Sequence, residues 1–199
     1  MIKPSTKLLL LSDIDAVVSD WFVGYREFML KVKGIESTGE LPTIFHMLDV
    51  FPDLEKPWEH IMEYQESEHY KSMPVYDDVA ETLVDLNKIG VEVHFITSCG
   101  DTHKIQTARN EYMSEKFGGL YEIIHYLGLG EDKTAVFDMY KDVSVPVVYI
   151  DDQEKMLLPA EQFGFKTVLK NMAYNRCADG KYHRVSGYAE LGELIKSML

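Results

Sequence analysis

The sequence contains few cysteines and few basic residues. Only two of its 199 residues are cysteines, Cys99 and Cys177, so no disulfide framework is expected, and a reduced, cytoplasmic setting is the simpler interpretation. Twenty Lys and Arg stand against 33 Asp and Glu, which gives a formal net charge of -13. Because binding to a polynucleotide backbone depends on clustered Lys and Arg, this balance argues against a nucleic-acid partner. It leaves room for a small phosphorylated substrate held by a metal ion and a few local cations.

Targeting segments, membrane spans and repeats are also missing from the pattern. The start, MIKPSTKLLLLSD, has a short apolar run that soon meets an acid, so it lacks the length and the cleavage site of a signal peptide. No run approaches the length of a membrane span, and no internal repeat is visible. An apolar content of 46% and an aromatic content of 12% are typical of a globular protein. The length indicates one domain, or one domain with an insertion, and leaves the oligomeric state open between monomer and homodimer.

Apolar runs and helical periodicities alternate along most of the chain. Strands are expected over 7–12, 91–96, 120–127, 145–150 and 166–169. Helices are expected over 79–89, 131–141, 155–163 and 188–199, and another helix from a cap at Asp101 or Thr102 to about Phe117. A polar loop is expected over 171–187. Such alternation predicts an α/β fold with a Rossmann-like parallel sheet, right-handed crossovers and helices on both faces.

Residues 19–74 interrupt this alternation directly after the first strand. Aromatic and apolar residues recur near period 3.6 over 19–32, a shorter apolar repeat covers 41–50, and a third helical pattern covers 57–70 with Trp58 among its apolar positions. The sequence therefore predicts a core made of residues 1–18 and 75–199, and a small, mostly helical unit of residues 19–74.

Polar residues follow three of the expected strands. They are Asp13 and Asp15 after the first strand, Thr97 and Ser98 after the second, and Asp151 and Asp152 after the run VPVVYI. The carboxyl ends of parallel strands meet at one edge of a sheet, where ligands of open α/β sheets bind. One such set could be no more than an acidic turn, but three sets at one edge favour a functional site.

The chemistry that this edge supports is phosphoryl transfer. Neighbouring carboxylates repel one another unless a cation intervenes, and Mg²⁺ prefers oxygen ligands. One carboxylate can attack phosphorus, and a second acid can protonate the leaving oxygen and later activate water. Thr97 can hold phosphate oxygens, and a lysine is needed to neutralise the remaining charge. Lys133, 18 residues before Asp151, is the preferred lysine; Lys104 and Lys141 are alternatives that suit solvated helix faces better.

The chain resembles the haloacid dehalogenase-like hydrolase superfamily, most of whose members are phosphatases. The first motif of that family, Asp-x-Asp-x-Thr/Val, is matched by Asp13-Ile14-Asp15-Ala16-Val17, with Ala16 in place of the usual Gly. The second motif is matched by HFIT ending at Thr97, the third by Lys133, and the fourth by VVYIDD. The likeness covers nearly the whole chain in the right order, and it implies that residues 19–74 form the helical cap of this family.

The resemblance also implies roles for the matched residues. Asp13 would be the nucleophile and a metal ligand, and Asp15 would be the general acid/base and a ligand through its backbone carbonyl. Asp151 would be the acid on the Mg²⁺ ion with Asp152 beside it, although the sequence leaves open which of the two contacts the metal. Thr97 and Lys133 complete the catalytic set, and Ser98 either binds phosphate or caps the next helix.

Within the family, SDIDAVVSDWFVGYREF is similar to the opening of the 5'(3')-deoxyribonucleotidases. In those enzymes an aromatic-lined cap pocket takes the base, which makes Trp21, Phe22 and Tyr25 candidate wall residues; each could instead belong to the core of the cap. The resemblance thus implies a nucleoside monophosphate as substrate and Mg²⁺ as cofactor.

Two other functions remain open at this stage. The segment VVYIDDQEKMLLPAEQFGF also resembles phosphatase domains that act on polynucleotide ends, a function that the net charge of -13 disfavours. A non-catalytic binding module with the same fold is the other alternative, and the presence of every motif residue disfavours it.

Overall fold

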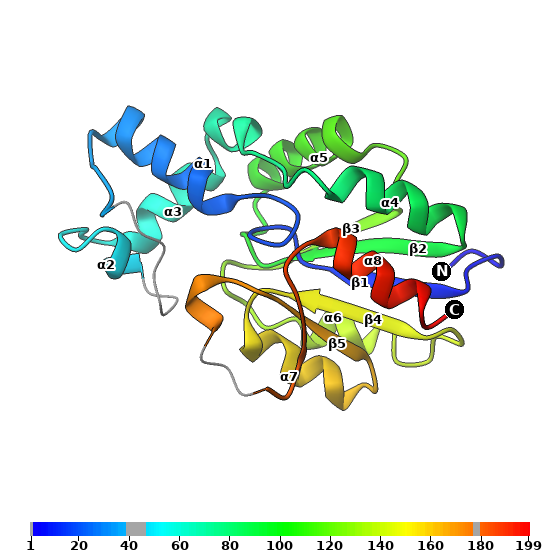
Figure 1. Ribbon diagram of the computed structural model, residues 1–199. Coiled ribbons are helices and arrows are strands. Elements are labelled where there is room, and N and C mark those ends of the chain that lie inside the picture. The colour runs from blue at the N-terminus through cyan, green and yellow to red at the C-terminus, as the bar shows by residue number, and fades with distance from the viewer. Residues whose placement is uncertain (1, 39–46, 177–179) are drawn as a thin grey trace.

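The computed structural model describes residues 2–38, 47–176 and 180–199 (Figure 1). Its centre is a six-stranded sheet with the order β3-β2-β1-β4-β5-β6, in which every pairing is parallel. The strands are β1 (Leu8–Ser12), β2 (Val91–Thr97), β3 (Ile123–Tyr126), β4 (Val147–Asp151), β5 (Lys166–Lys170) and β6 (His183–Val185). This sheet confirms the predicted α/β fold with a parallel sheet.

Strand β1 lies at the middle of the sheet and is buried on both faces. Leu10 is in register with Val93 of β2 on one side and with Val148 of β4 on the other. Leu8 and Leu10 face one hydrophobic core, whereas Leu9 and Leu11 face the other. Because both faces are covered, the strand reads as an unbroken run of leucines and does not alternate with polar residues.

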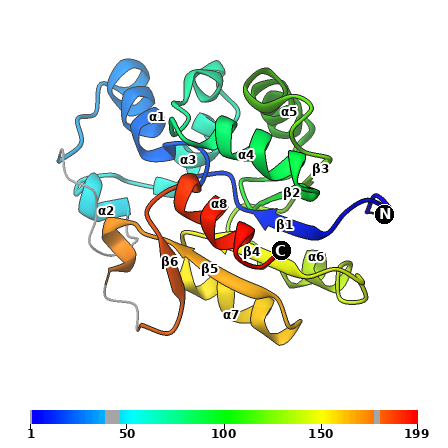
Figure 2. The same ribbon diagram turned by 45° about the vertical axis from the view of Figure 1, so that its right-hand side comes forward.

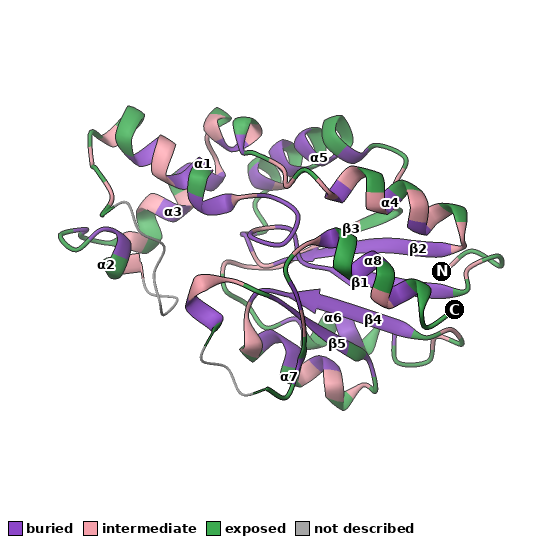
Figure 3. Cartoon of the chain, viewed as in Figure 1, coloured by how far each residue is buried: buried purple, intermediate pink, exposed green. Residues whose placement is uncertain are grey.

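Helices cover the two faces of the sheet, as Figures 1 and 2 show. One core packs α4 (Val79–Lys88), α5 (His103–Phe117) and α8 (Tyr188–Lys196) against the sheet. The other core packs α6 (Thr134–Asp138) and α7 (Glu154–Gln162) against the opposite face. Figure 3 shows the central strands in the colour of buried residues, as this three-layer arrangement requires. Because the strands are parallel, the carboxyl ends of β1, β2 and β4 lie at one edge of the sheet.

A helical region follows β1 and lies beyond the carboxyl ends of the strands (Figure 1). It contains α1 (Trp21–Phe28), the π-helix η1 (Met29–Lys33), α2 (Met47–Val50), α3 (Pro57–Gln65) and the 3₁₀ helix η2 (Glu68–Ser72). We call it the helical insertion. The amide of Asp20 donates to the carbonyl of Pro74 at 2.8 Å, and the amide of Tyr76 donates to the carbonyl of Val18 at 3.1 Å. The entering and leaving segments therefore pair at a narrow neck; the division into two domains at 18/19 and 74/75 stays a prediction.

Several element boundaries differ from the sequence prediction. The loop expected over 171–187 contains the 3₁₀ helix η3 (Ala173–Asn175) and strand β6, because β6 has only three residues and no apolar alternation. The helix expected over 131–141 is limited to α6, and the helix expected over 57–70 is divided into α3 and η2. The apolar repeat over 41–50 lies largely outside the described residues, as does Cys177. In the ranges that the structure describes, no helix has the length and apolarity to cross a membrane.

Candidate active site

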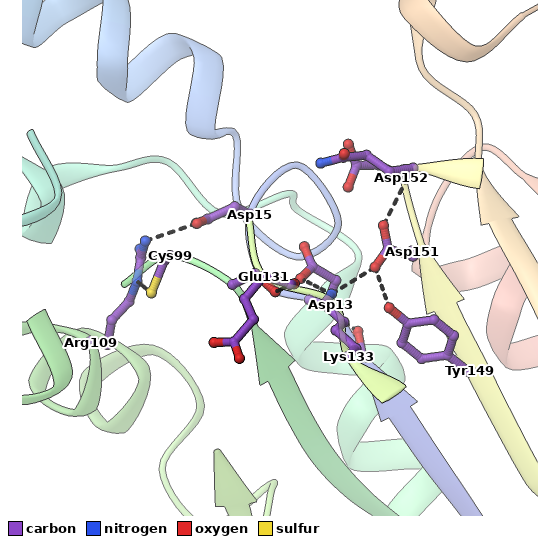
Figure 4. Close-up of polar contacts among 12 residues, drawn as sticks. Asp13, Asp15, Cys99, Arg109, Glu131, Lys133, Tyr149, Asp151 and Asp152 are labelled. Carbon is purple, nitrogen blue, oxygen red and sulfur yellow. Dashed lines mark hydrogen bonds and ion pairs between the residues drawn. The ribbon is translucent and has the colours of Figure 1, made fainter. Parts of the chain in front are cut away.

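A buried lysine joins two of the strand ends. Lys133 lies directly before α6, and its Nζ donates to Asp13 Oδ1 at 2.5 Å and to Asp151 Oδ2 at 2.7 Å (Figure 4). The lysine side chain is 2% exposed, and those of the two aspartates are 10% and 2% exposed. The alternatives Lys104 and Lys141 form exposed ion pairs elsewhere. The structure thus places Lys133, and neither alternative, beside the strand-end carboxylates.

The two acids at the end of β4 have different surroundings. Asp151 Oδ2 accepts hydrogen bonds from Lys133 and from the hydroxyl of Tyr149, and its Oδ1 accepts from the Gln153 amide at 2.8 Å. Asp152 Oδ2 accepts one hydrogen bond, from the hydroxyl of Tyr174 in η3. Both oxygens of Asp151 are therefore occupied, whereas Oδ1 of Asp152 accepts no hydrogen bond from any described residue.

Crowding of carboxylates shapes the electrostatics of this edge. The pKa of Asp13 is raised to about 7: burial raises it most, the charge of Lys133 opposes this, and the charges of Asp151 and Asp15 add to the increase. Burial and the charges of Asp151 and Asp13 raise the pKa of Asp152 well above its usual value. Burial alone would lower the pKa of Lys133, but its two aspartate partners outweigh burial and raise it. One lysine thus leaves the edge with an excess of negative charge, which a divalent cation would relieve.

Asp15, the second acid of the first motif, is turned away from Asp13. Its Oδ2 accepts a hydrogen bond from Arg109 Nη2 at 2.8 Å, and its Oδ1 accepts one from the Tyr70 hydroxyl at 3.2 Å. Figure 4 shows the two aspartates pointing toward different partners. The next residue, Ala16, has a φ of 64°, in the left-handed region that favours glycine. The tight turn after β1 therefore holds an alanine in a strained conformation.

Thr97 and Ser98 end β2 on the same edge of the sheet. Thr97 is buried and lines the cavity, as expected for a residue that contacts phosphate. The Ser98 hydroxyl donates to the carbonyl of Glu131 at 2.8 Å, and the amide of Gly130 donates to the carbonyl of Ser98 at 2.9 Å. The Ser98 hydroxyl is thus bonded to the loop that leads to Lys133. The sequence predicts either a phosphate contact or a helix cap for Ser98, and this loop is a third partner.

A cavity opens above these residues. Asp13, Asp15, Lys133, Asp151 and Asp152 line its floor, and two of the three candidate wall residues, Trp21 and Phe22 of α1, line its wall. The prediction for Tyr25 is not met: this residue is completely buried and stacks on Trp21 with ring centroids 4.7 Å apart, inside the insertion. Helical periodicity identifies the apolar face of α1 but does not separate positions that meet the cavity from positions that meet other helices.

The cavity also has wall residues that the sequence analysis missed. Trp58, Ile61 and Gln65 of α3 line it, at spacings of three and four residues that place them on one helix face. Trp58 is 60% exposed, although its position in the periodic pattern suggested an interior residue. In the sequence, these three residues could have been linked to one another only by their shared face on the predicted helix. Tyr149 had a local signal too, because residues two apart on a strand share a face, which places it beside Asp151.

The four aspartates do not form a ready metal cage. Among the described residues, no three His, Cys, Asp or Glu side chains gather closely enough to hold a metal ion. Lys133 lies between Asp13 and Asp151, and the side chain of Asp15 is turned toward Arg109. The metal set of Asp13, Asp15, Asp151 and Asp152 therefore stays a prediction.

The fold agrees with that of solved haloacid dehalogenase-like hydrolases. No protein-family model and no curated protein matches the sequence. Among solved structures, a haloacid dehalogenase-like family hydrolase from Streptococcus pneumoniae is similar, with a TM-score of 0.64, 12% identity, and coverage of 97% of this chain and 100% of that chain. A predicted phosphatase from Clostridium acetobutylicum has a TM-score of 0.67 and 14% identity, with coverage of 96% and 99%.

A third similar structure contains a metal and an anion. It is a D,D-heptose 1,7-bisphosphate phosphatase from B. bronchiseptica complexed with magnesium and phosphate, with a TM-score of 0.56, 14% identity, and coverage of 96% of this chain and 99% of that chain. At such low identity these likenesses establish the haloacid dehalogenase-like fold, while the chemistry of this chain has to be argued from its own residues.

Proposed function

We propose that the protein is a magnesium-dependent phosphatase that hydrolyses small phosphomonoesters through an aspartyl-phosphate on Asp13. The observation that supports this most strongly is the buried Asp13–Lys133–Asp151 cluster at the carboxyl ends of the central strands. It faces a cavity whose wall carries Trp21, Phe22 and Trp58, a concave site of the kind that takes a small-molecule substrate. The similar structures include phosphatases, which adds support from the fold.

The residues fit a Mg²⁺ ion because oxygen donors and an excess of negative charge meet at this edge. Asp13, the backbone carbonyl of Asp15 and one acid of the Asp151–Asp152 pair would hold the ion. We favour Asp152 as that acid, since its Oδ1 accepts no hydrogen bond from the described residues while both oxygens of Asp151 are engaged. When bound, Mg²⁺ would offset the negative charges of Asp13 and of the substrate phosphate.

The protein residues have distinct roles in the proposed reaction. A carboxylate oxygen of Asp13 attacks phosphorus, and the bond from phosphorus to the leaving oxygen breaks. Lys133 and Thr97 hold the phosphoryl oxygens, and Asp15 gives a proton to the leaving oxygen. Asp15 then takes a proton from water, which attacks phosphorus, releases phosphate and restores Asp13. Asp151 keeps Lys133 in place through the 2.7 Å contact.

For the substrate, we favour nucleoside monophosphates. The cavity wall carries three aromatic residues, Trp21, Phe22 and Trp58, and the exposed Trp58 offers a planar surface for a base. A polynucleotide end is a poorer candidate because the chain carries a net charge of -13. The cytoplasmic location and the choice between monomer and homodimer stay predictions.

The test is phosphate release from a panel of deoxyribonucleoside and ribonucleoside monophosphates, sugar phosphates and a 3'-phosphorylated oligonucleotide, with Mg²⁺ and with chelator. Asp13→Asn keeps the shape of the side chain and is expected to lower kcat on the order of 1000-fold or more. Asp138→Asn is the matched control, because Asp138 lies on the surface of α6 in an exposed ion pair. Equal activity of both variants would contradict the role of Asp13, and turnover confined to the oligonucleotide would favour end processing.

A further inference from the structure

A second buried cation, Arg109 of α5, lies on the other side of the first motif from Lys133. The residue is 1% exposed, and it is 94 residues away from Asp15 in the sequence. Its Nη2 donates to Asp15 Oδ2 at 2.8 Å and also to the side-chain carbonyl of Gln65, at the end of α3. Its Nε donates to Cys99 Sγ at 3.3 Å, after β2. Its Cζ lies 3.2 Å from the ring centre of Tyr70 in η2. One guanidinium thus links the core, the first motif and two segments of the helical insertion.

The cluster fixes both oxygens of the Asp15 carboxylate. Arg109 donates to Oδ2, and the hydroxyl of Tyr70 donates to Oδ1 at 3.2 Å. The same Tyr70 ring packs against the guanidinium, so the two donors also support each other. Figure 4 shows the Asp15 side chain directed at Arg109 and away from the Asp13–Lys133 pair. The rotamer of Asp15 is therefore set by one core residue and one residue of the insertion.

Packing alone does not account for an arginine at this place. Burying a guanidinium carries a large desolvation cost, and apolar residues of similar volume often fill such sites without loss of stability. In addition, Nη1 of Arg109 is buried and has no hydrogen-bond partner within the described parts of the chain. Buried polar groups that lack partners are rare and call for an explanation. Contact with the acid/base residue of the proposed reaction supplies one.

We propose that Arg109 is a positioning residue that sets the orientation of Asp15 and couples this orientation to the helical insertion through Gln65 and Tyr70. This inference rests on the proposed function, because it concerns Asp15 as the acid/base of that reaction. Arg109 itself does not line the cavity, so it acts through Asp15 and not on the substrate. A displaced insertion would remove the Tyr70 and Gln65 contacts together and leave Asp15 held by Arg109 alone.

The role of Asp15 in two steps makes the proposal testable. An alkyl phosphate needs a proton from Asp15 when the ester bond breaks, whereas an aryl phosphate has a leaving group that departs as an anion. Both substrates need Asp15 in the second step, when water loses a proton and attacks the phosphorus bound to Asp13. Disordering Asp15 should therefore slow both steps for an alkyl phosphate but mainly the second step for an aryl phosphate.

The experiment compares Arg109→Lys and Arg109→Gln with the wild-type protein on both substrates. We expect kcat for the alkyl phosphate to fall about 10- to 100-fold with KM changed less, since general acid–base help is worth about that much or more. With the aryl phosphate, rapid mixing should show a burst of about one phenol per active site in the variants and none in the wild type. Tyr70→Phe, which keeps the ring but removes the donor to Oδ1, should show a smaller loss in the same direction.

Tyr112→Phe is the matched control for a purely structural effect. Tyr112 lies one turn after Arg109 on α5, is equally buried, and bonds to the Ser19 hydroxyl at 2.8 Å and the Met73 carbonyl at 3.1 Å at the neck of the insertion. Its hydroxyl makes no hydrogen bond to Asp15, and phenylalanine keeps the ring that packs against Tyr70. Removal of the hydroxyl should therefore lower the melting temperature and leave kcat and the burst unchanged.

The outcomes separate this inference from the proposed function. An active wild-type protein whose Arg109 variants keep wild-type kcat at equal folded fraction, or lose activity on both substrates without a burst, would overturn the role of Arg109 alone. A wild-type protein that releases no phosphate and forms no phosphoenzyme would overturn the proposed function and this role with it.

Discussion

Replacing Lys133 with methionine removes the ammonium group that lies between Asp13 and Asp151. The two ion pairs, at 2.5 and 2.7 Å, are almost completely buried. Methionine has a similar length and volume, so the change deletes the charge without leaving a large cavity. The two aspartates would then face each other and Asp152 in a buried site without a cation in contact.

The structure gives the expected size of this effect. Breaking a buried ion pair by removing one partner costs about 3–5 kcal/mol, because the remaining charge stays buried without compensation. We expect Lys133→Met to lose that amount of unfolding free energy in metal-free buffer with chelator, as measured by urea denaturation. Lys141→Met is the control, since the pair of Lys141 with Asp138 has a similar distance, 2.9 Å, but is about half exposed. A surface pair of this kind contributes about 1 kcal/mol or less.

The loss of unfolding free energy in Lys133→Met should also depend on pH. Burial already raises the pKa of Asp13 to about 7 with Lys133 present, and removal of the lysine raises it further. A carboxyl whose pKa is higher in the folded than in the unfolded state binds more protons when folded, so the fold gains stability as the pH falls. The deficit of Lys133→Met should therefore be larger at pH 8 than at pH 6. Equal deficits for Lys133→Met and Lys141→Met would refute the reasoning, because they would mean that the cluster is not a buried set of charges.

Two further predictions concern other parts of the molecule. Trp58→Ala should raise KM for nucleoside monophosphates about 5- to 100-fold, because stacking of a base on an aromatic side chain is worth about 1–3 kcal/mol. KM for a small alkyl phosphate, which has no base to stack, should hardly change. The melting temperature should also hardly change, since Trp58 is 60% exposed. His94 bonds to Glu92 and Tyr140, and Tyr140 bonds to His125. Burial lowers the pKa of both histidines, so the unfolded chain is protonated at a higher pH than the folded chain. The free energy of unfolding should therefore fall as the pH drops below about 6.5, by at most about 1.4 kcal/mol per pH unit for each histidine. In urea denaturation, the double variant His94→Gln, His125→Gln should show a flatter pH dependence than the wild type.

The parts of the fold that were predictable have strong local signals. The four leucines of β1 are followed by Ser12 and then Asp13, and such an unbroken apolar run is typical of a strand buried on both faces. The hydroxyl of Thr102 accepts from the amide of Ile105 and starts α5, one of the two expected caps. Lys133 was predictable because its distance along the chain from Asp151 suits a helix start that returns to the same edge of the sheet.

The missed residues depend on contacts between distant parts of the chain. Arg109 sits in a helix rich in polar residues, and its burial comes from partners 94 and 44 residues away, Asp15 and Gln65. Tyr174 bonds to Asp152 from a segment that the sequence pattern presents as a loop. Tyr25 has the correct periodicity, but its surroundings are decided by packing between helices of the insertion. Local periodicity contains no information about such pairings.

The distribution of the buried cations separates the four acids of the site into three environments. Lys133 serves Asp13 and Asp151 on the side of the core, and Arg109 serves Asp15 on the side of the insertion. Asp152 is in contact with no cation in the described ranges, and its bonded partner, Tyr174, is neutral. Burial and the charges of Asp151 and Asp13 raise the pKa of Asp152 well above its usual value, and the residue lines the same cavity as Asp13. A divalent cation bound at this edge would therefore gain most from Asp152, the acid that neither Lys133 nor Arg109 contacts.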